Sequence, residues 1–442
     1  MQSKYIHYSN LSSRLDPLYY LSDLAIFTDR QITASIGELC SSMYSGFAAG
    51  KETQVKKESG YIQIRPTNIM PDGRLSFEKN VYVPKNRNYT FIPQKAVLFN
   101  NTNSQELVGK TAILDLPNED QYYCSNHITV IIPDQTKLIP EYLWIILNLY
   151  QRRTIFYSIC TNWNNQSGVN VNLLKSVRIP IFSKEANVSL DYQRKIVAIW
   201  LEAFSVERTK EQEAKDLLDS IDDYLLSELG IERLERTENG RFFYTSFKEI
   251  TGGELAPISV QNRGKQSKST QYKEIKLSTI ASITKGQAIT SKEIVDGEYP
   301  VIAGGQSSPY THNQYNHKGD VITVSASGAY SGYVWYHDYP IFASDCSVIF
   351  SKDNNVFLTK YIYEILRLRQ KEIYLLQKGA GQPHVYASDL AQITIPVVSI
   401  EKQMEIILHC NNLRIAADEL TQEGKNLVES AKITIETMIL GE

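Results

Sequence analysis

The chain alternates twice between short apolar runs and one long helical pattern. Runs such as AVLF (96–99) and DVITV (320–324) are separated by Gly, Asn, Pro and Asp turns, which is typical of short strands. One apolar helical run follows in each half, EYLWIIL in the first and KYIYEIL in the second. This order of elements predicts two α+β domains.

Each predicted domain is followed by a long helical pattern without proline. Apolar residues recur at 3/4 spacing from Gln193 to Leu229 and again along the last part of the chain. The stripe positions are Ile196, Trp200, Ala203, Ala214, Leu217, Ile221 and Tyr224, and then Ile406, Cys410, Leu413, Ala417, Leu420, Leu427, Ala431 and Met438. Glu207 and Lys210 interrupt the first stripe, and Gly424 interrupts the second. Either helix, at about 37 residues, would reach roughly 55 Å. We expect the two to pack against each other as a spacer; the alternative is a single amphipathic helix on each domain.

The two halves also match in sequence. Gln166, Val169, Leu174 and Pro180 in QSGVNVNLLKSVRIP recur as Gln382, Val385, Leu390 and Pro396 in QPHVYASDLAQITIP, all at an offset of 216. At an offset of 219, SNHITVII aligns with SDCSVIF, and Tyr142 aligns with Tyr361. Gly109 and Gly332 follow matching apolar runs, and ELCSSMYSG (38–46) loosely resembles TIASITKG (279–286). A duplicated unit indicates that the protein performs one kind of task twice.

These patterns divide the chain into five parts. We expect an N-terminal segment at residues 1–34, a first domain at 35–190, and a long helix with linker at 191–256. A second domain then occupies 257–396, and a C-terminal helix occupies 397–442. The polar stretch Pro257–Ser269 is interpreted as the linker into the second domain.

Composition and charge narrow the class of protein. The net charge of -3 hides a division, because residues 35–190 and 257–396 carry +4 and +3 while the two helical segments sum to -10. Five separated cysteines without a C-x-x-C pair argue against a zinc ribbon or a disulfide framework. No run approaches the ~18 apolar residues of a membrane span, and the N-terminus lacks the apolar core of a signal peptide. We therefore expect a cytoplasmic protein with no membrane partner.

Motifs for catalysis are incomplete. DPLYY (16–20) lacks the second proline of the adenine methyltransferase signature, and no glycine-rich cofactor turn occurs in the chain. RGKQS (263–267) lacks the upstream glycine and the hydroxyl residue of a P-loop. Three histidines, His312, His317 and His337, could form a metal or acid–base site with Asp338 and Asp345, although they lack the rigid helical spacing of known zinc motifs. They could equally be DNA-facing polar residues or ordinary core and surface histidines.

With these features the chain resembles the specificity subunits of type I restriction-modification systems over its whole length. The most specific segments are GDVITVSASGAYSGYV (319–334), GAGQPHVYASDLAQITIPVVSIEKQ (379–403) and SRLDPLYY (13–20). The resemblance implies two target recognition domains, each followed by a long α-helix, with the two helices paired as an antiparallel coiled coil. It implies a non-catalytic subunit of phage defence that binds double-stranded DNA, joins two modification subunits and recruits restriction subunits. The cofactor S-adenosylmethionine is then expected in the modification subunit.

The first repeat departs from the family pattern. FNNTNSQELVGKTA stands where the second repeat has its Ser-Gly turn, as expected if the two domains read different half-sites. In the second repeat, Ala326 stands where many relatives have a basic residue.

The candidate DNA-binding residues follow from the chemistry of base and phosphate recognition. Amide and charged side chains read base edges in the major groove, and Lys and Arg contact phosphates. The candidates for base reading are Asn162, Asn164, Asn165 and Gln166 in the first repeat, with Gln382 and His384 in the second. Suitable phosphate partners are Lys56, Lys57, Arg65, Lys285 and Lys378. The resemblance adds Gln306, Ser325, Ser327 and Tyr330 to the DNA-binding candidates.

Two other classes of protein remain open at this point. One is a metal-dependent hydrolase built on the three histidines, and the other is a structural coiled-coil adaptor that binds no nucleic acid. Neither explains a domain-and-helix unit occurring twice as directly as a two-part DNA target does.

Overall fold

The computed structural model describes residues 32–85, 88–116, 121–163, 166–232, 267–379 and 381–440. It divides into two compact units, the first running up to Arg208 and resuming at Gly424, the second comprising Thr209–Glu423. The expected N-terminal segment up to residue 31, the linker up to residue 266, and Asn164 and Asn165 lie outside the described residues.

The first domain is built on a four-stranded antiparallel sheet with the order β2-β9-β5-β7. These strands are β2 (Cys40–Ser45), β9 (Ile128–Pro133), β5 (Val97–Asn100) and β7 (Thr111–Ile113). A smaller sheet joins β4 (Tyr82–Val83), β3 (Tyr61–Ile64) and β8 (Tyr123–Cys124), with β3 and β8 parallel. The other strands are β1 (Thr33–Ser35) paired with β12 (Arg178–Pro180), and β6 (Thr102–Asn103), β10 (Thr161–Trp163) and β11 (Gln166–Gly168) in one sheet. The helices are α3 (Ile36–Leu39), α4 (Pro140–Arg152), α5 (Ile155–Ile159) and α6 (Val171–Ser176), with 3₁₀ turns η2 (Lys51–Thr53), η3 (Lys57–Ser59) and η4 (Pro66–Asn68).

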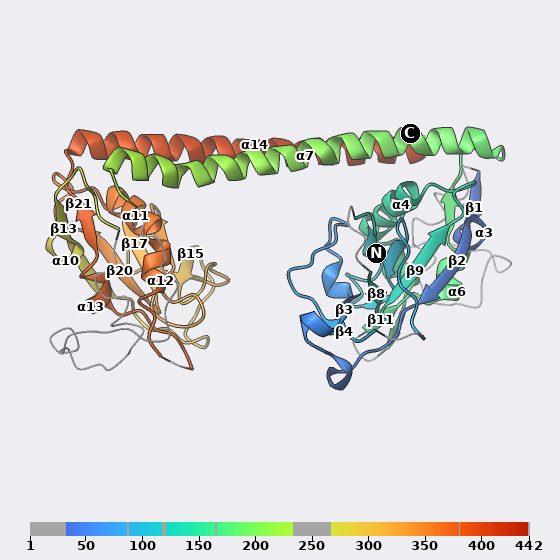
Figure 1. Ribbon diagram of the computed structural model, residues 1–442, viewed down its shortest axis with the longest axis horizontal. Coiled ribbons are helices and arrows are strands. Elements are labelled where there is room, and N and C mark those ends of the chain that lie inside the picture. Colours follow the sequence, from blue (N-terminus) through green and yellow to red (C-terminus); the bar gives the residue numbers. More distant parts are fainter. Residues whose placement is uncertain are drawn as a thin grey trace. The chain divides into compact units, whose positions relative to one another are not determined.

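The second domain repeats three of these four sheets; among the described residues it has no counterpart of the β10-β11-β6 sheet. Its four-stranded sheet has the order β14-β20-β17-β18, comprising β14 (Ala281–Lys285), β20 (Cys346–Ser351), β17 (Val321–Ser325) and β18 (Val334–His337). Its smaller sheet joins β16 (Thr311–His312), β15 (Tyr299–Ile302) and β19 (Phe342–Ala343), and β13 (Glu274–Lys276) pairs with β21 (Thr394–Pro396). The helices are α10 (Leu277–Ile280), α11 (Thr359–Leu368), α12 (Gln370–Tyr374) and α13 (Ala387–Leu390). The predicted duplication of an α+β unit is thus confirmed (Figure 1).

The central strands are mostly apolar because both faces of the sheet are covered. In β5, Val97 and Phe99 belong to the core beneath α4, whereas Leu98 belongs to the core shared with the smaller sheet. In β17, Ile322 and Val324 belong to the helix side and Val321 belongs to the other side. Successive residues of a strand point to opposite faces, so apolar residues occur on both faces of these strands.

Two pairs of hydrogen bonds recur at matching positions of the two domains. Tyr142 Oη donates to Pro180 O at 2.8 Å, and Tyr361 Oη donates to Pro396 O at 2.9 Å. The buried side chain of Gln193 accepts from Ile139 N at the start of α4, as Gln403 does from Leu358 N at the start of α11. These bonds satisfy polar groups that burial would otherwise strip of partners. The sequence offsets therefore reflect one shared frame.

Two long helices follow the domains, α7 (Ala186–Leu229) and α14 (Ile400–Leu440). Within the first unit, Trp200 of α7 lies in the same core as Val428 and Ile435 of α14. Within the second unit, Lys210 of α7 pairs with Glu423 of α14 at 2.6 Å. An antiparallel coiled coil along the full length of both helices stays a prediction.

The stripe along α14 differs from the predicted one after Ala417. Leu427 is 43% exposed, whereas Val428 is buried at 7%. Gly424 itself occupies a stripe position, since a Cβ there would lie 3.3 Å from the Cα of Glu207 on α7. The 3/4 spacing thus runs on through Gly424 without a slip. Glu207, predicted to break the stripe of α7, is likewise buried at 8%.

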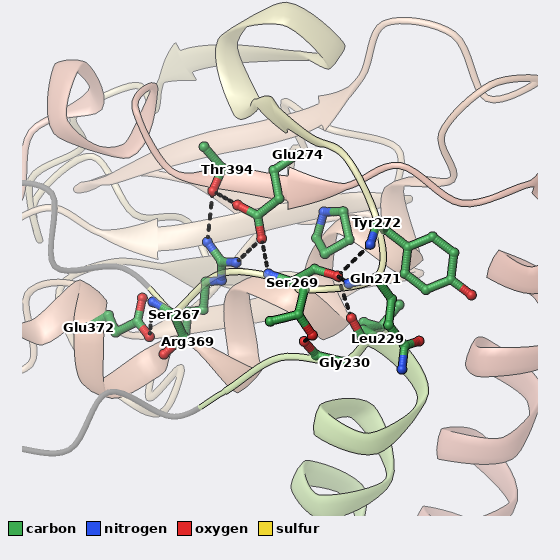
Figure 2. A network of polar contacts seen from close by, with 12 residues as sticks. Leu229, Gly230, Ser267, Ser269, Gln271, Tyr272, Glu274, Arg369, Glu372 and Thr394 are labelled. Atoms are coloured by element: carbon green, nitrogen blue, oxygen red, sulfur yellow. Dashed lines mark hydrogen bonds and ion pairs between the residues drawn. The ribbon is translucent and has the colours of Figure 1, made fainter.

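A polar network fixes the end of α7 to the second domain (Figure 2). Ser269 Oγ donates to Leu229 O, the last residue of α7, and Ser269 N donates to Glu274 Oε1 at 2.8 Å. The buried guanidinium of Arg369 donates to the same Glu274 oxygen at 3.0 Å and to Thr394 Oγ1 at 3.2 Å. The Glu274 carboxylate and the Thr394 hydroxyl thus supply partners for the buried charge of Arg369, as buried ionised groups require.

The two domains contact their helices through different chemistry. In the first unit, Trp144 of α4 packs edge-on against Trp200 of α7, with ring centroids 5.7 Å apart, and both rings lie near Phe204. In the second unit, Arg414 of α14 forms a bidentate ion pair with Glu364 of α11, at 2.7 and 2.6 Å. Arg414 corresponds to Phe204 at the offset of 210 that also relates Gln403 to Gln193, and Glu364 corresponds to Ile145 at the offset of 219.

Within the described residues, no helix has both the length and the apolar character required to cross a membrane.

Candidate nucleic-acid interface

The loops at one end of the second domain's central sheet hydrogen-bond to one another. Val385 N donates to Ala326 O at 3.1 Å, and Gly328 N donates to Pro383 O at 3.1 Å. Ala326 N donates to Asp345 O at 3.2 Å, which brings the β19–β20 corner to the loop after β17. We refer to residues 285–287, 303–308, 326–332, 343–346, 378–379 and 381–386 as the second loop face.

A glycine allows two connections to cross closely at this face. A Cβ on Gly286 would lie 2.1 Å from Ser344 O, and one on Gly46 in the first domain would lie 2.0 Å from Cys124 O. Contacts this short exclude any side chain. The loose resemblance of ELCSSMYSG to TIASITKG thus marks an equivalent crossing in both domains.

The second loop face carries several exposed side chains that the sequence singled out. Lys285, Gln306 and Gln382 are exposed, and Tyr330 is 49% exposed. His384 is half-buried, and its backbone forms two hydrogen bonds with Lys378, at 2.8 and 2.9 Å. The Ser327 hydroxyl donates to Asp345 Oδ2. Amides, hydroxyls and one imidazole therefore gather at the tips of adjoining loops, as base reading requires.

Two of the predicted contacts fit this face poorly. Ser325 is only 4% exposed, because both faces of β17 are covered up to this last residue of the strand. Lys378 is engaged within the domain, where Nζ lies 2.8 Å from Asp389 Oδ2 and 5.5 Å from the centre of the Tyr386 ring. A phosphate contact at Lys378 would have to compete with this ion pair. Ser325 and Lys378 stay predicted DNA contacts, with this burial and this ion pair as the observations against them.

The corresponding first loop face is formed by residues 46–51, 56–57, 65–69, 101–109, 124–127, 161–163 and 166–168. Its centre is Asn101, whose Nδ2 donates to Thr129 Oγ1 at 3.0 Å and to Asn126 O at 3.2 Å. Asn101 O accepts from Val169 N at 2.9 Å, as Ala326 O accepts from Val385 N. The frame of the two faces is thus the same while the side chains differ.

The candidate side chains of the first domain take different positions. Lys56, Lys57 and Gln166 are exposed. Asn162 is exposed as well, and its Oδ1 accepts a hydrogen bond from Ser167 Oγ at 2.5 Å across the β10–β11 hairpin. The guanidinium of Arg65 donates to Ala49 O at 2.8 Å and to Gln63 Oε1 at 3.0 Å, so it supports the loops as well as lying beside them.

The predicted equivalence of Gln166 and Gln382 is confirmed by the strand register. Thr102 pairs with Gly168 in the first domain, and Ser327 pairs with His384 in the second. Gly168 and His384 are separated by the offset of 216 that also relates the two glutamines. Gln166 and Gln382 therefore occupy the same position relative to their central sheets.

The three histidines do not form a common site. His312 Nδ1 accepts from Val295 N at 3.1 Å, and His337 Nε2 lies 2.8 Å from Thr323 Oγ1. Burial lowers the pKa of His337 to about 4, so this imidazole is neutral at pH 7. Within the described residues, no three His, Cys, Asp or Glu side chains gather as metal ligands.

Sequence reasoning assigned Asp345 to that histidine group and missed Asn126. Both are exposed at the same corner of their domains, and the alignment of SNHITVII with SDCSVIF places them in register. That alignment was the signal that could have found them.

Comparison with known proteins finds relatives of one family. A family model for the type I restriction modification DNA specificity domain matches residues 33–215 and 269–430. A type I specificity subunit of Mycoplasma pneumoniae is 20% identical over 366 residues, covering 81% of this chain and 87% of that protein. A specificity subunit of a Methanocaldococcus jannaschii type I restriction enzyme is 33% identical over 85 residues, which is 19% of this chain and 20% of that protein.

Solved structures resemble the chain in fold. One solved structure comes from work on complex assembly and conformational transition of the type I restriction-modification system. Its chain matches this one with a TM-score of 0.53 at 13% identity. The match covers 92% of this chain and 96% of that one. A crystal structure of a Mycoplasma genitalium S subunit has a TM-score of 0.46 at 16% identity, covering 93% and 96%.

The protein contains two copies of one domain, and each copy has a polar loop face built on the same backbone arrangement. The two loop faces lie at equivalent positions and carry different side chains. The family model matches well over half of the chain. The chain therefore belongs to the type I restriction-modification DNA specificity family.

Proposed function

We propose that this chain reads a bipartite, asymmetric target in double-stranded DNA, each loop face recognising one half-site. The observation that carries the proposal is that the two domains share one backbone arrangement at their loop faces but differ in the side chains there. Asn101 and Ala326 accept the same backbone hydrogen bond, yet one bears an amide and the other a methyl group. An identical frame docks each domain in the same way, whereas different side chains select different bases.

The chain acts within a larger enzyme in this proposal. It holds two modification subunits and recruits restriction subunits, while α7 and α14 set the distance between the half-sites. The solved relative described in terms of complex assembly supports the partner class. The modification subunits would supply S-adenosylmethionine and flip the target adenine out of the duplex, and this chain would contribute no catalytic group.

The direct test is a methylation assay with purified components and S-adenosylmethionine. The chain alone is expected to leave DNA unmodified, whereas addition of the modification subunits of its own system should give methylation at one sequence motif. Mapping of modified adenines then gives both half-sites and their spacing. Methyl transfer by the homogeneous chain would contradict the non-catalytic role, and motif-independent methylation by the complex would contradict target reading.

Two substitutions separate base reading from phosphate contact on the second loop face. Gln382→Ala in the assembled methyltransferase should lower discrimination at one base pair by about 1–3 kcal/mol and barely change affinity for unrelated DNA. Lys285→Ala should weaken binding to all sequences and reduce the slope of log K against log salt by about one. Lys378→Ala is the matched control, because that ammonium is paired with Asp389, and its salt slope should stay unchanged. Titrations on matched and mismatched duplexes at several salt concentrations measure all three.

A further inference from the structure

Asp345 places an exposed carboxylate among three loops of the second loop face. Its backbone oxygen accepts from Ala326 N, and its Oδ2 accepts from the Ser327 hydroxyl. A Cβ on Gly304 would lie 2.7 Å from Ser327 O and 3.5 Å from Oδ2, so the glycine allows its loop to pass close to Ser327 beside the carboxylate. A carboxylate can accept about four hydrogen bonds, and this exposed group keeps capacity beyond the bond from Ser327.

A negative charge at this position needs a specific partner on DNA. Phosphates repel a carboxylate, and general affinity for DNA depends on phosphate neutralisation by cations. In the major groove, only the amino groups of cytosine and adenine donate hydrogen bonds. Adenine carries the N7 acceptor beside its N6 amino group, and that acceptor would face the second carboxylate oxygen. Cytosine presents N4 without a neighbouring major-groove acceptor on the same base. A carboxylate therefore fits cytosine best.

The equivalent residue of the first domain has different chemistry. Asn126 is exposed at the same corner, and its Oδ1 lies 3.4 Å from Ser125 Oγ. An amide both donates and accepts, which matches the N6 and N7 pair of adenine, whereas a carboxylate only accepts. The two loop faces thus place an amide and a carboxylate at one structural position.

We propose that Asp345 is a base-reading residue of the second loop face and accepts a hydrogen bond from the N4 amino group of a cytosine in the second half-site. The Ser327 hydroxyl positions the carboxylate by donating to its other side. This inference rests on the proposed function, because it requires that the second loop face meets DNA.

The test uses the complete methyltransferase, this chain assembled with its modification subunits, after its target motif has been mapped. Each base pair of the second half-site is replaced in turn, and binding is titrated for the natural chain, Asp345→Asn and Asp345→Ala. The natural complex should lose about tenfold or more at one C·G pair when cytosine is replaced by thymine, because thymine O4 repels the carboxylate. Asp345→Asn should lose most of this discrimination at that pair while keeping it elsewhere.

Two controls separate base reading from a structural role. Asn126→Ala should alter discrimination only in the first half-site. Asp345→Ala should bind unrelated DNA at least as tightly as the natural complex, since a repulsive charge is removed; a residue that merely supports the loops would instead weaken discrimination at several pairs and lower the melting temperature.

The outcomes distinguish this inference from the proposed function. A complex that shows no preferred sequence would overturn both. A complex that reads its target equally well with Asp345→Asn, or a second half-site without a cytosine in either strand, would overturn the role of Asp345 alone.

Discussion

Replacing Thr33–Pro180 with the first domain of a relative that reads another target should change one half of the recognised sequence and preserve the other. The exchange respects the fold, because Thr33 pairs with Pro180 across the β1–β12 ladder and both crossover points lie at its ends. Each mismatched base pair typically costs about 1–3 kcal/mol, and the costs add for separated positions. Affinity for the original target should therefore fall by about 10²-fold or more when three base pairs differ.

Mapping of methylated adenines in cells that carry the chimera measures this outcome. A matched chimera with Glu274–Pro396 exchanged should change the opposite half-site, because β13 and β21 close the second domain in the same way. Simultaneous change of both half-sites by either chimera would show that the domains do not read independently.

Removing the carboxylate of Glu364 should destabilise the second unit by about 3 kcal/mol. Glu364 is fully buried and Arg414 is 23% exposed, so Glu364→Ala leaves a largely desolvated guanidinium without its bidentate partner. The free energy of unfolding in urea measures the loss. Asp191→Ala is the matched control, since its pair with Arg194 is 68% and 62% exposed and contributes about 0–1 kcal/mol.

A double variant tests the reason for that loss. Glu364→Leu with Arg414→Leu removes both charges together, and it should recover most of the stability lost in Glu364→Ala, because buried ion pairs are often replaceable by apolar residues. Equal losses in the double and the single variant would mean that packing, rather than the unpaired charge, dominates the effect.

The duplicated fold could be predicted because the frame residues keep their spacing. Leu174 and Leu390 are both buried, and Tyr142 and Tyr361 donate to matching carbonyls. Strands buried on both faces leave a strong apolar signal, which is why β5 and β17 were found as AVLF and DVITV. Gly424 shows the limit of such patterns. A search for apolar side chains overlooks a position where two helices touch because a glycine has no side chain.

The candidate site was less predictable because residue type does not fix the direction of a side chain. Gln382 and Lys285 are exposed as expected, whereas Ser325 points inward from a neighbouring strand end. Lys378 was chosen for its charge, but its ion pair with Asp389 depends on how the 378–386 loop meets α13. The sequence does point to Asp345, but it groups this residue with three histidines. Those histidines lie in separate positions, each with its own hydrogen bonds.

The different contacts beneath the two domains limit which recombinants can fold. At the position where the second domain buries Glu364 against Arg414, the first has Ile145 next to an aromatic group that includes Phe204. A second-position domain placed in the first position would bring a carboxylate to the site of Ile145 in the apolar core of the first unit, without the arginine that pairs with it in the second unit. We therefore expect a domain that moves to the other position to fold better when the adjoining half of its helix moves with it.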